Sequence, residues 1–181
     1  MIYKFRIVSS DVDDFRRDII IDSESTFLEF RDIICESTGY STDQMSSFHT
    51  CNRDWENQEE ITLEDLGLDF SRDLYIMKDT HLSDLINDEG DLLKFTFDNI
   101  TDRSLFIQLK EVIPGKNLLQ PECILSIGKA PSQNVDLDEF DAAIDAKAAQ
   151  MAADMDLDED FYGSTDFNED ELDYYDDSVL D

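Results

Sequence analysis

Alternating apolar and polar residues predict several short strands along the first 134 residues. Tyr3, Phe5 and Ile7 alternate with Lys4 and Arg6, which is the pattern of a strand with one buried face. Further strands are predicted over residues 17–22, 45–51, 74–77, 93–97 and 105–109. The short segment 98–103 between the last two strands predicts a hairpin.

Helical spacing replaces this alternation after the second predicted strand. Apolar residues recur every three or four positions from Phe27 to Ile34, Thr26 with Glu29 matches a capping box, and Gly39 is a typical helix end. Shorter helices are predicted over residues 62–67 and 81–86. Several strands with one main helix predict an α+β fold in which a mostly antiparallel sheet packs with that helix.

The residues after Asn134 follow a different pattern. An apolar stripe from Phe140 to Met155 predicts an amphipathic helix within residues 135–155, which packs on the preceding domain or on a partner. Residues 156–181 are acidic with scattered aromatics and cannot build a core, so we predict a disordered tail. The predicted organisation is therefore a domain over 1–134, a helix over 135–155 and an acidic tail over 156–181.

The net charge of −31, from 45 acidic and 14 basic residues, narrows the possible functions. Residues 135–181 alone hold 18 acidic residues and a single lysine. Direct nucleic-acid binding and attachment to an anionic membrane are disfavoured, because affinity for phosphate comes from Lys and Arg. The charge instead favours either simple solubility or a partner protein with a basic surface.

The beginning of the chain and its cysteines indicate a cellular setting. The N-terminal residues lack the apolar run of a signal peptide, and no stretch approaches the roughly 18 apolar residues of a membrane helix. Cys35, Cys51 and Cys123 form neither a disulfide framework nor a CxxC metal motif. We therefore expect a cytoplasmic protein with reduced cysteines.

The sequence offers no strong motif for chemistry. His49 and His81 stand in no metal-ligand spacing, and Cys51 is expected only to share a strand face with His49. Acidic runs beginning at Asp154 and Asp166 match the first three ligand positions of a calcium loop but lack its glycine. We therefore predict no catalytic, cofactor-binding or metal site.

Aromatic residues within the acidic tail are the candidate partner-binding residues. They are Phe161, Tyr162, Phe167, Tyr174 and Tyr175. Neighbouring carboxylates keep such side chains hydrated and steer them toward a basic surface. The alternative interpretation is that the tail serves solubility alone.

The order of segments from Tyr3 to Pro131 resembles the plasmid pRiA4b ORF-three-like family of bacterial and archaeal proteins. The matching segments are YKFRI, FRRDIII, TFLEFRDII followed by Gly39-Tyr40, LSDLI, FTFDNITDR and PECILSIGKAPSQ. This resemblance implies an α+β fold and a bacterial cytoplasmic setting. It implies no mechanism, because no activity is firmly assigned to the family.

Several of the family's motif residues are replaced in this chain. Phe15 stands in place of the tryptophan before the arginine pair, Arg31 in place of a helix histidine, and residues 44–48 (QMSSF) in place of a His-rich segment. In the hairpin motif Asp98 is kept, whereas Arg103 takes the place of a tryptophan. These replacements indicate a divergent branch with an acidic tail.

Three functional hypotheses follow from the sequence. The preferred one is a non-enzymatic protein-interaction module whose tail contacts a basic partner. The second is a divergent enzyme or small-ligand binder with a pocket in the body, for which Arg16, Arg17, Trp55 and Asp98 are the candidate residues. The third is an inhibitor that mimics nucleic acid and occupies a groove on another protein.

Overall fold

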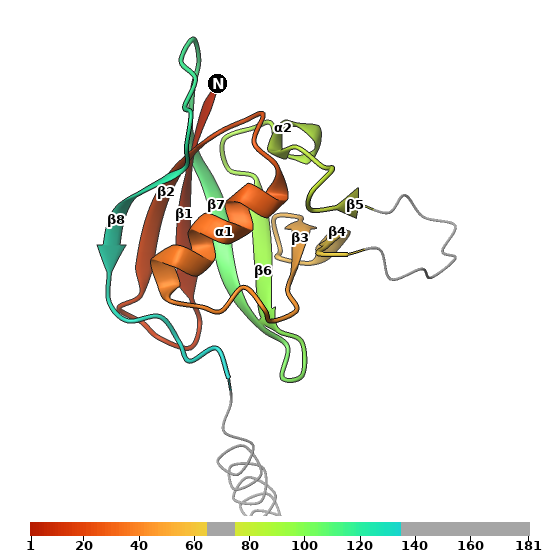
Figure 1. Cartoon of the computed structure of the whole chain (residues 1–181), viewed down its shortest axis with the longest axis vertical. Coiled ribbons are helices and arrows are strands. Elements are labelled where there is room, and N and C mark those ends of the chain that lie inside the picture. The colour runs from red at the N-terminus through yellow and green to blue at the C-terminus, as the bar shows by residue number, and fades with distance from the viewer. Residues whose placement is uncertain (65–74, 135–181) are drawn as a thin grey trace, which may run out of the picture. The chain divides into compact units, whose positions relative to one another are not determined.

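The structure is a computed structural model that describes residues 1–64 and 75–134 of the chain (Figure 1). The predicted helix over 135–155, the predicted tail over 156–181 and most of the short helix predicted over 62–67 lie outside these residues. The described part of the chain contains eight strands, which form one sheet, and two helices.

The elements follow one another as strands interrupted by two helices. They are β1 (Ile2–Ser9), β2 (Arg16–Asp22), α1 (Phe27–Thr38), β3 (Ser47–Cys51), β4 (Asn57–Thr62), β5 (Tyr75–Ile76), α2 (Leu82–Leu85), β6 (Leu92–Asp98), β7 (Arg103–Ile113) and β8 (Glu122–Ile127). In space the strands lie in the order β5-β4-β3-β6-β7-β1-β2-β8, and only the β4–β5 pair is parallel among those described. The predicted α+β fold with a mostly antiparallel sheet is confirmed. The sequence pattern did not predict β4 or β8.

Local signals set both ends of α1. The Thr26 hydroxyl accepts a hydrogen bond from the Glu29 backbone N–H (3.2 Å), and the Glu29 carboxylate accepts one from the Thr26 N–H (2.8 Å), as in a capping box. At the other end Gly39 adopts a φ of 79°, and its N–H donates to the Cys35 carbonyl (2.9 Å).

No helix in the described part of the chain is long and apolar enough to cross a membrane.

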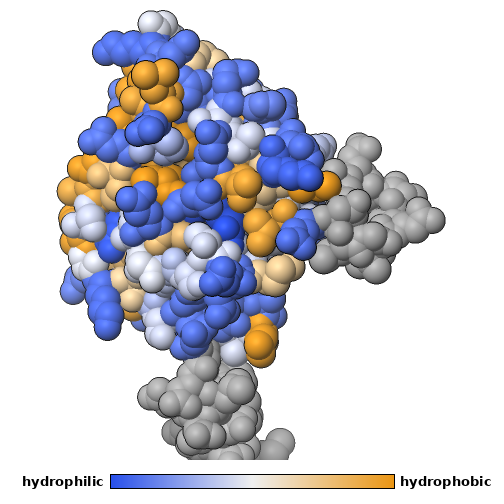
Figure 2. Space-filling model, in the orientation of Figure 1, coloured by the Kyte–Doolittle hydropathy of each residue, from blue (hydrophilic) through white to orange (hydrophobic). Residues whose placement is uncertain are grey.

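The hydrophobic core fills the space between α1 and one face of the sheet, which α1 crosses in Figure 1. Phe30 of α1 lies 4.6 Å from Phe5 of β1 and 5.6 Å from Phe48 of β3, measured between ring centroids. Phe48 in turn lies 4.9 Å from Phe95 of β6. The core thus ties the helix to three strands that are distant in sequence. Figure 2 shows hydrophobic and hydrophilic residues interspersed over the surface on the α1 side.

The opposite face of the sheet carries polar, cationic and apolar side chains in register; we call it the open face. One row of paired residues crosses it: His49, Lys94, Phe106, Val8 and Arg16, from β3, β6, β7, β1 and β2. Val8 is 39% exposed, which shows that solvent reaches this row. Antiparallel pairing alternates side chains between faces, so the strand residues that avoid the core gather here.

Candidate functional site

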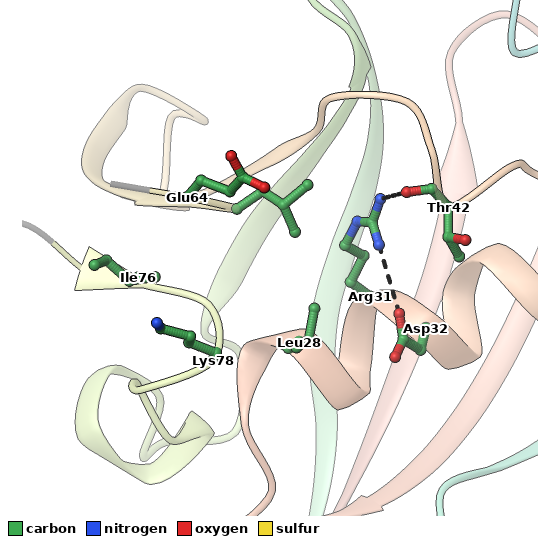
Figure 3. A pocket seen from close by; sticks show the side chains of 8 residues that line it. Leu28, Arg31, Asp32, Thr42, Glu64, Ile76 and Lys78 are labelled. Atoms are coloured by element: carbon green, nitrogen blue, oxygen red, sulfur yellow. Dashed lines mark hydrogen bonds and ion pairs between the residues drawn. The ribbon is translucent and has the colours of Figure 1, made fainter. Parts of the chain in front are cut away.

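A cavity of about 670 Å³ lies between α1, the loop before β3 and the region of β4 and β5 (Figure 3). It is lined by Leu28, Arg31, Asp32, Thr42, Leu63, Glu64, Ile76 and Lys78. Figure 3 shows Glu64 and Lys78 on one side and Arg31 with Thr42 on the other. We call it the α1 cavity. Its volume lies within the roughly 300–1,000 Å³ of small-molecule sites.

The buried guanidinium of Arg31 organises one wall of the α1 cavity. Its Nε donates to the Ser46 hydroxyl (2.8 Å), and its Nη2 donates to the backbone carbonyls of Thr42 and Gln44. Nη1 lies 3.5 Å from the Asp32 carboxylate, which offsets the charge. Most hydrogen bonds of the Arg31 guanidinium therefore fix the loop between α1 and β3.

A smaller cavity of about 140 Å³ lies on the open face; we call it the Lys94 cavity. It is lined by Ser10, Asp11, Asn57, Lys94, Thr96, Asp102, Arg103, Ser104 and Phe106. The Lys94 ammonium donates to the Trp55 carbonyl (2.6 Å) and to the Asn57 amide oxygen (3.1 Å). The cavity therefore joins two cations, two carboxylates, several hydroxyls and an aromatic wall, a combination suited to binding a small polar group.

Asp98 fixes the β6–β7 hairpin that borders the Lys94 cavity. Its carboxylate accepts hydrogen bonds from the Thr101 hydroxyl (2.6 Å) and from Arg103 Nη2 (3.0 Å). Burial alone would raise the pKa of Asp98, but the hydrogen bonds from Thr101 and Arg103 outweigh it and hold that pKa below its usual value. Asp98 is therefore an ionised structural residue, and Arg103 is largely neutralised by it.

His49 lies beside Lys94 on the open face and has an unsatisfied atom. Its buried Nδ1 has no hydrogen-bond partner within the described residues, and its Nε2 lies 3.7 Å from the Glu60 carboxylate. Burial lowers the pKa of His49, and Lys94 acts in the same direction, although Glu60 partly opposes them. The imidazole is therefore neutral at pH 7.

We expect this partly buried histidine to make the stability of the fold depend on pH. The pKa of His49 is lower in the folded than in the unfolded chain, so its contribution is complete above an unfolded pKa of about 6.5 and is lost as the pH falls through the folded pKa. Urea unfolding at neutral pH and at about pH 5 should show a smaller loss on acidification for His49→Gln than for the wild type. His81→Gln is the matched control, because His81 is the exposed N-cap residue of α2. Equal losses in His49→Gln and the wild type would contradict the assignment.

The four candidate residues for a pocket in the body, Arg16, Arg17, Trp55 and Asp98, do not lie together at one site. Trp55 and Asp98 lie next to the Lys94 cavity. The Trp55 carbonyl accepts a hydrogen bond from Lys94, and the Asp98 carboxylate accepts one from Arg103. Arg16 lies on the open face, where its Nη2 is 2.6 Å from the Asp18 carboxylate. Neither Arg16 nor Arg17 lines the Lys94 cavity.

Arg17 points to the other face of the sheet and is buried. Its guanidinium donates to backbone carbonyls of Ser37 (2.9 Å), Ile127 (2.6 Å) and Gly128 (3.1 Å). These bonds link β2, the end of α1 and the end of β8, so the residue has a structural role. The aromatic candidates Phe161, Tyr162, Phe167, Tyr174 and Tyr175 lie outside the described residues.

A family model described as plasmid pRiA4b ORF-3-like protein matches residues 2–176. The chain belongs to this family. No curated protein matches the sequence. A crystal structure of a protein of unknown function, MM3350 from Methanosarcina mazei Go1, is similar, with a TM-score of 0.54 and 18% sequence identity. The similarity covers 69% of this chain and 68% of that chain, and at this identity it shows the fold alone.

Two positions at which this chain departs from the motifs of the pRiA4b ORF-3-like family meet beside the α1 cavity. Arg31 stands where the resemblance places a helix histidine, and Ser46 lies within the segment that replaces the His-rich one. The structure brings these two replaced positions into a direct hydrogen bond. The family match also extends past Pro131, where the sequence resemblance ended, and takes in most of the acidic residues after Asn134.

Proposed function

We propose that this member of the pRiA4b ORF-3-like family is a non-enzymatic protein-interaction module of the bacterial cytoplasm. Its acidic C-terminal residues contact a basic surface on a partner protein. The charge distribution carries this proposal, since residues 135–181 hold 18 of the 45 acidic residues and one of the 14 basic ones. A segment of one sign steers association with a partner of the opposite sign.

The body has the properties of a scaffold for such a segment. Its buried core includes residues from Tyr3 to Ala130, so the described residues of the body pack around one core. The hydrogen bonds of three charged side chains, Arg31, Arg17 and Asp98, hold loops and strand ends in place. These observations favour a structural role for the three side chains, in a rigid body, over a role in proton transfer.

A capture experiment with matched baits tests the proposal. The full chain is compared, at low and at high salt, with a full-length variant carrying serine at Phe161, Tyr162, Tyr174 and Tyr175. The variant keeps every charge, so we expect it to capture less of the partner, and we expect high salt to release the partner from both baits. Displacement by DNA would indicate that the acidic residues occupy a nucleic-acid groove.

A third bait gives the outcome that contradicts the proposal. A chain ending at Asn134, whose folding is checked by its melting temperature, should capture no partner. If it captures the same partner as strongly as the full chain, the acidic residues are not the binding element.

The α1 cavity favours a second function, binding of a small amphipathic ligand. Its lining joins the apolar side chains of Leu28, Leu63 and Ile76 with the charged side chains of Lys78 and Glu64. A ligand that binds there should raise the melting temperature of the wild-type chain and not that of Ile76→Trp, which fills the cavity. A metabolite screen without any rise counts against this function.

A further inference from the structure

We propose that the Lys94 cavity on the open face binds a carboxylate group. This inference goes beyond the proposed function, because every residue that carries it lies within the body and none within the acidic segment. The carboxylate belongs either to a small organic acid or to a polypeptide, and the experiment below distinguishes these sources.

The charge of Lys94 is the first reason. Within the described residues its ammonium forms no ion pair with a carboxylate. Its two acceptors, the Trp55 carbonyl and the Asn57 amide oxygen, are both neutral. An ammonium has three protons, so one remains for a ligand. A charge-assisted hydrogen bond to a carboxylate is the strongest use of that proton.

A hydroxyl pair supplies a second donor in the same cavity. The Thr96 and Ser104 hydroxyl oxygens are 3.0 Å apart, and either one can be the donor. Whichever donates, the proton of the other hydroxyl is free for a ligand. Both residues line the cavity together with Lys94, so the two free protons converge on one small space.

The backbone at Trp55 indicates that the site is preorganised. Trp55 adopts a φ of 63°, a left-handed conformation that is unfavourable for a bulky residue. This conformation accompanies the hydrogen bond from Lys94 to the Trp55 carbonyl and an edge-to-face contact of the indole with Phe106, at 5.0 Å between centroids. Strain of this kind persists only where its surroundings enforce it, and here it fixes the position of the cation.

Size and neighbouring charge select the ligand class. A volume of about 140 Å³ is well below that of sites for drug-sized ligands, so the cavity admits a terminal group rather than a whole cofactor. Asp11 and Asp102 also line the cavity, and Arg103 is paired with Asp98 (3.0 Å) and Asp11 (4.0 Å). Lys94 is therefore the one cation of this lining without an ion pair among the described residues, and a single ammonium near carboxylates suits a singly charged carboxylate better than a doubly charged phosphate.

Trp55 provides a direct measurement, because it is the only tryptophan in the chain. Its fluorescence is followed in the full-length protein during titration with acetate, with a blocked peptide containing one glutamate, and with inorganic phosphate, all at constant ionic strength. We expect a saturable change with a carboxylate and none with phosphate. A peptide that binds at least tenfold more tightly than acetate identifies a polypeptide source, whereas equal affinities identify a small acid.

Variants connect the fluorescence change to the cavity. Lys94→Met should weaken carboxylate binding by about tenfold or more, since a charged hydrogen bond is lost. Lys94 also supports the Trp55 loop, so Ser104→Ala, which leaves both Lys94 hydrogen bonds in place, should give a smaller weakening of about threefold or more. Lys129→Met removes an exposed cation after β8 and should change nothing. The proposal is overturned if no carboxylate gives a saturable change, if phosphate binds as well, or if Lys94→Met binds like the wild type.

Discussion

Replacing Phe48 with alanine is expected to lower the free energy of unfolding by about 3–5 kcal/mol. The Phe48 side chain is fully buried, with an exposure of 0%. It stacks against Phe30 at 5.6 Å, meets Phe27 at 5.4 Å and contacts Phe95 at 4.9 Å. Its loss leaves a cavity at the place where α1, β3 and β6 meet, and close-packed neighbours fill such a space only partly.

Urea unfolding followed by circular dichroism measures this loss. Small domains have total stabilities of about 5–15 kcal/mol, so Phe48→Ala is expected to be partly unfolded in a weakly stable body. Phe48→Leu keeps most of the volume and should retain a measurable transition with a smaller loss. Phe106→Ala is the control, because its ring lies on the open face and is only partly buried. A loss for Phe48→Ala no larger than for Phe106→Ala would show that the core is not centred on this ring.

The sequence predicted those parts of the fold that depend on local signals. The alternation of Tyr3, Phe5 and Ile7 matched β1, and Thr26 with Gly39 marked the ends of α1. These features need only neighbours within a few positions, so they are visible without knowledge of the partner strands.

The strands that the sequence missed lie toward the sides of the sheet. In β4 only Ile61 and Thr62 are buried, and the four residues before them are exposed. In β8 no residue is fully buried, and its pairing with β2 shifts register between Asp18 and Ile19. A strand that buries few side chains has little hydrophobic alternation, so its pattern resembles a loop.

The sites were less predictable than the fold, because each brings together residues that are distant in sequence. Alternation within β6 placed Lys94 and Thr96 on the polar face of that strand. Only the pairing with β7 brings Ser104 and Phe106 beside them. In the same way, Arg31 meets Ser46 only because the chain after α1 folds back onto the helix. Sequence spacing alone cannot show such meetings of distant residues.

The adjacent arginines of FRRDIII show how strongly a role depends on the face of a strand, and they lead to the second large prediction. Arg17 is 5% exposed, and its guanidinium donates to carbonyls of Ser37, Ile127 and Gly128 while lying 4.6 Å from the centroid of the Phe15 ring. Arg17→Leu is expected to lower the free energy of unfolding by about 2–4 kcal/mol, because it removes the hydrogen bonds that a buried, charged guanidinium donates to three backbone carbonyls.

Arg16→Leu is the matched control, one position away. The Arg16 side chain is 34% exposed, and its main partner Asp18 keeps a second ion pair with Arg6 at 3.2 Å. A partly exposed pair of this kind contributes about 1 kcal/mol or less. The losses in free energy of unfolding, measured by urea unfolding, should therefore differ between the two variants by more than the error of either measurement. Equal losses would mean that water replaces the hydrogen bonds from Arg17 to α1 and to the end of β8, and would contradict the structural role of Arg17 at this junction.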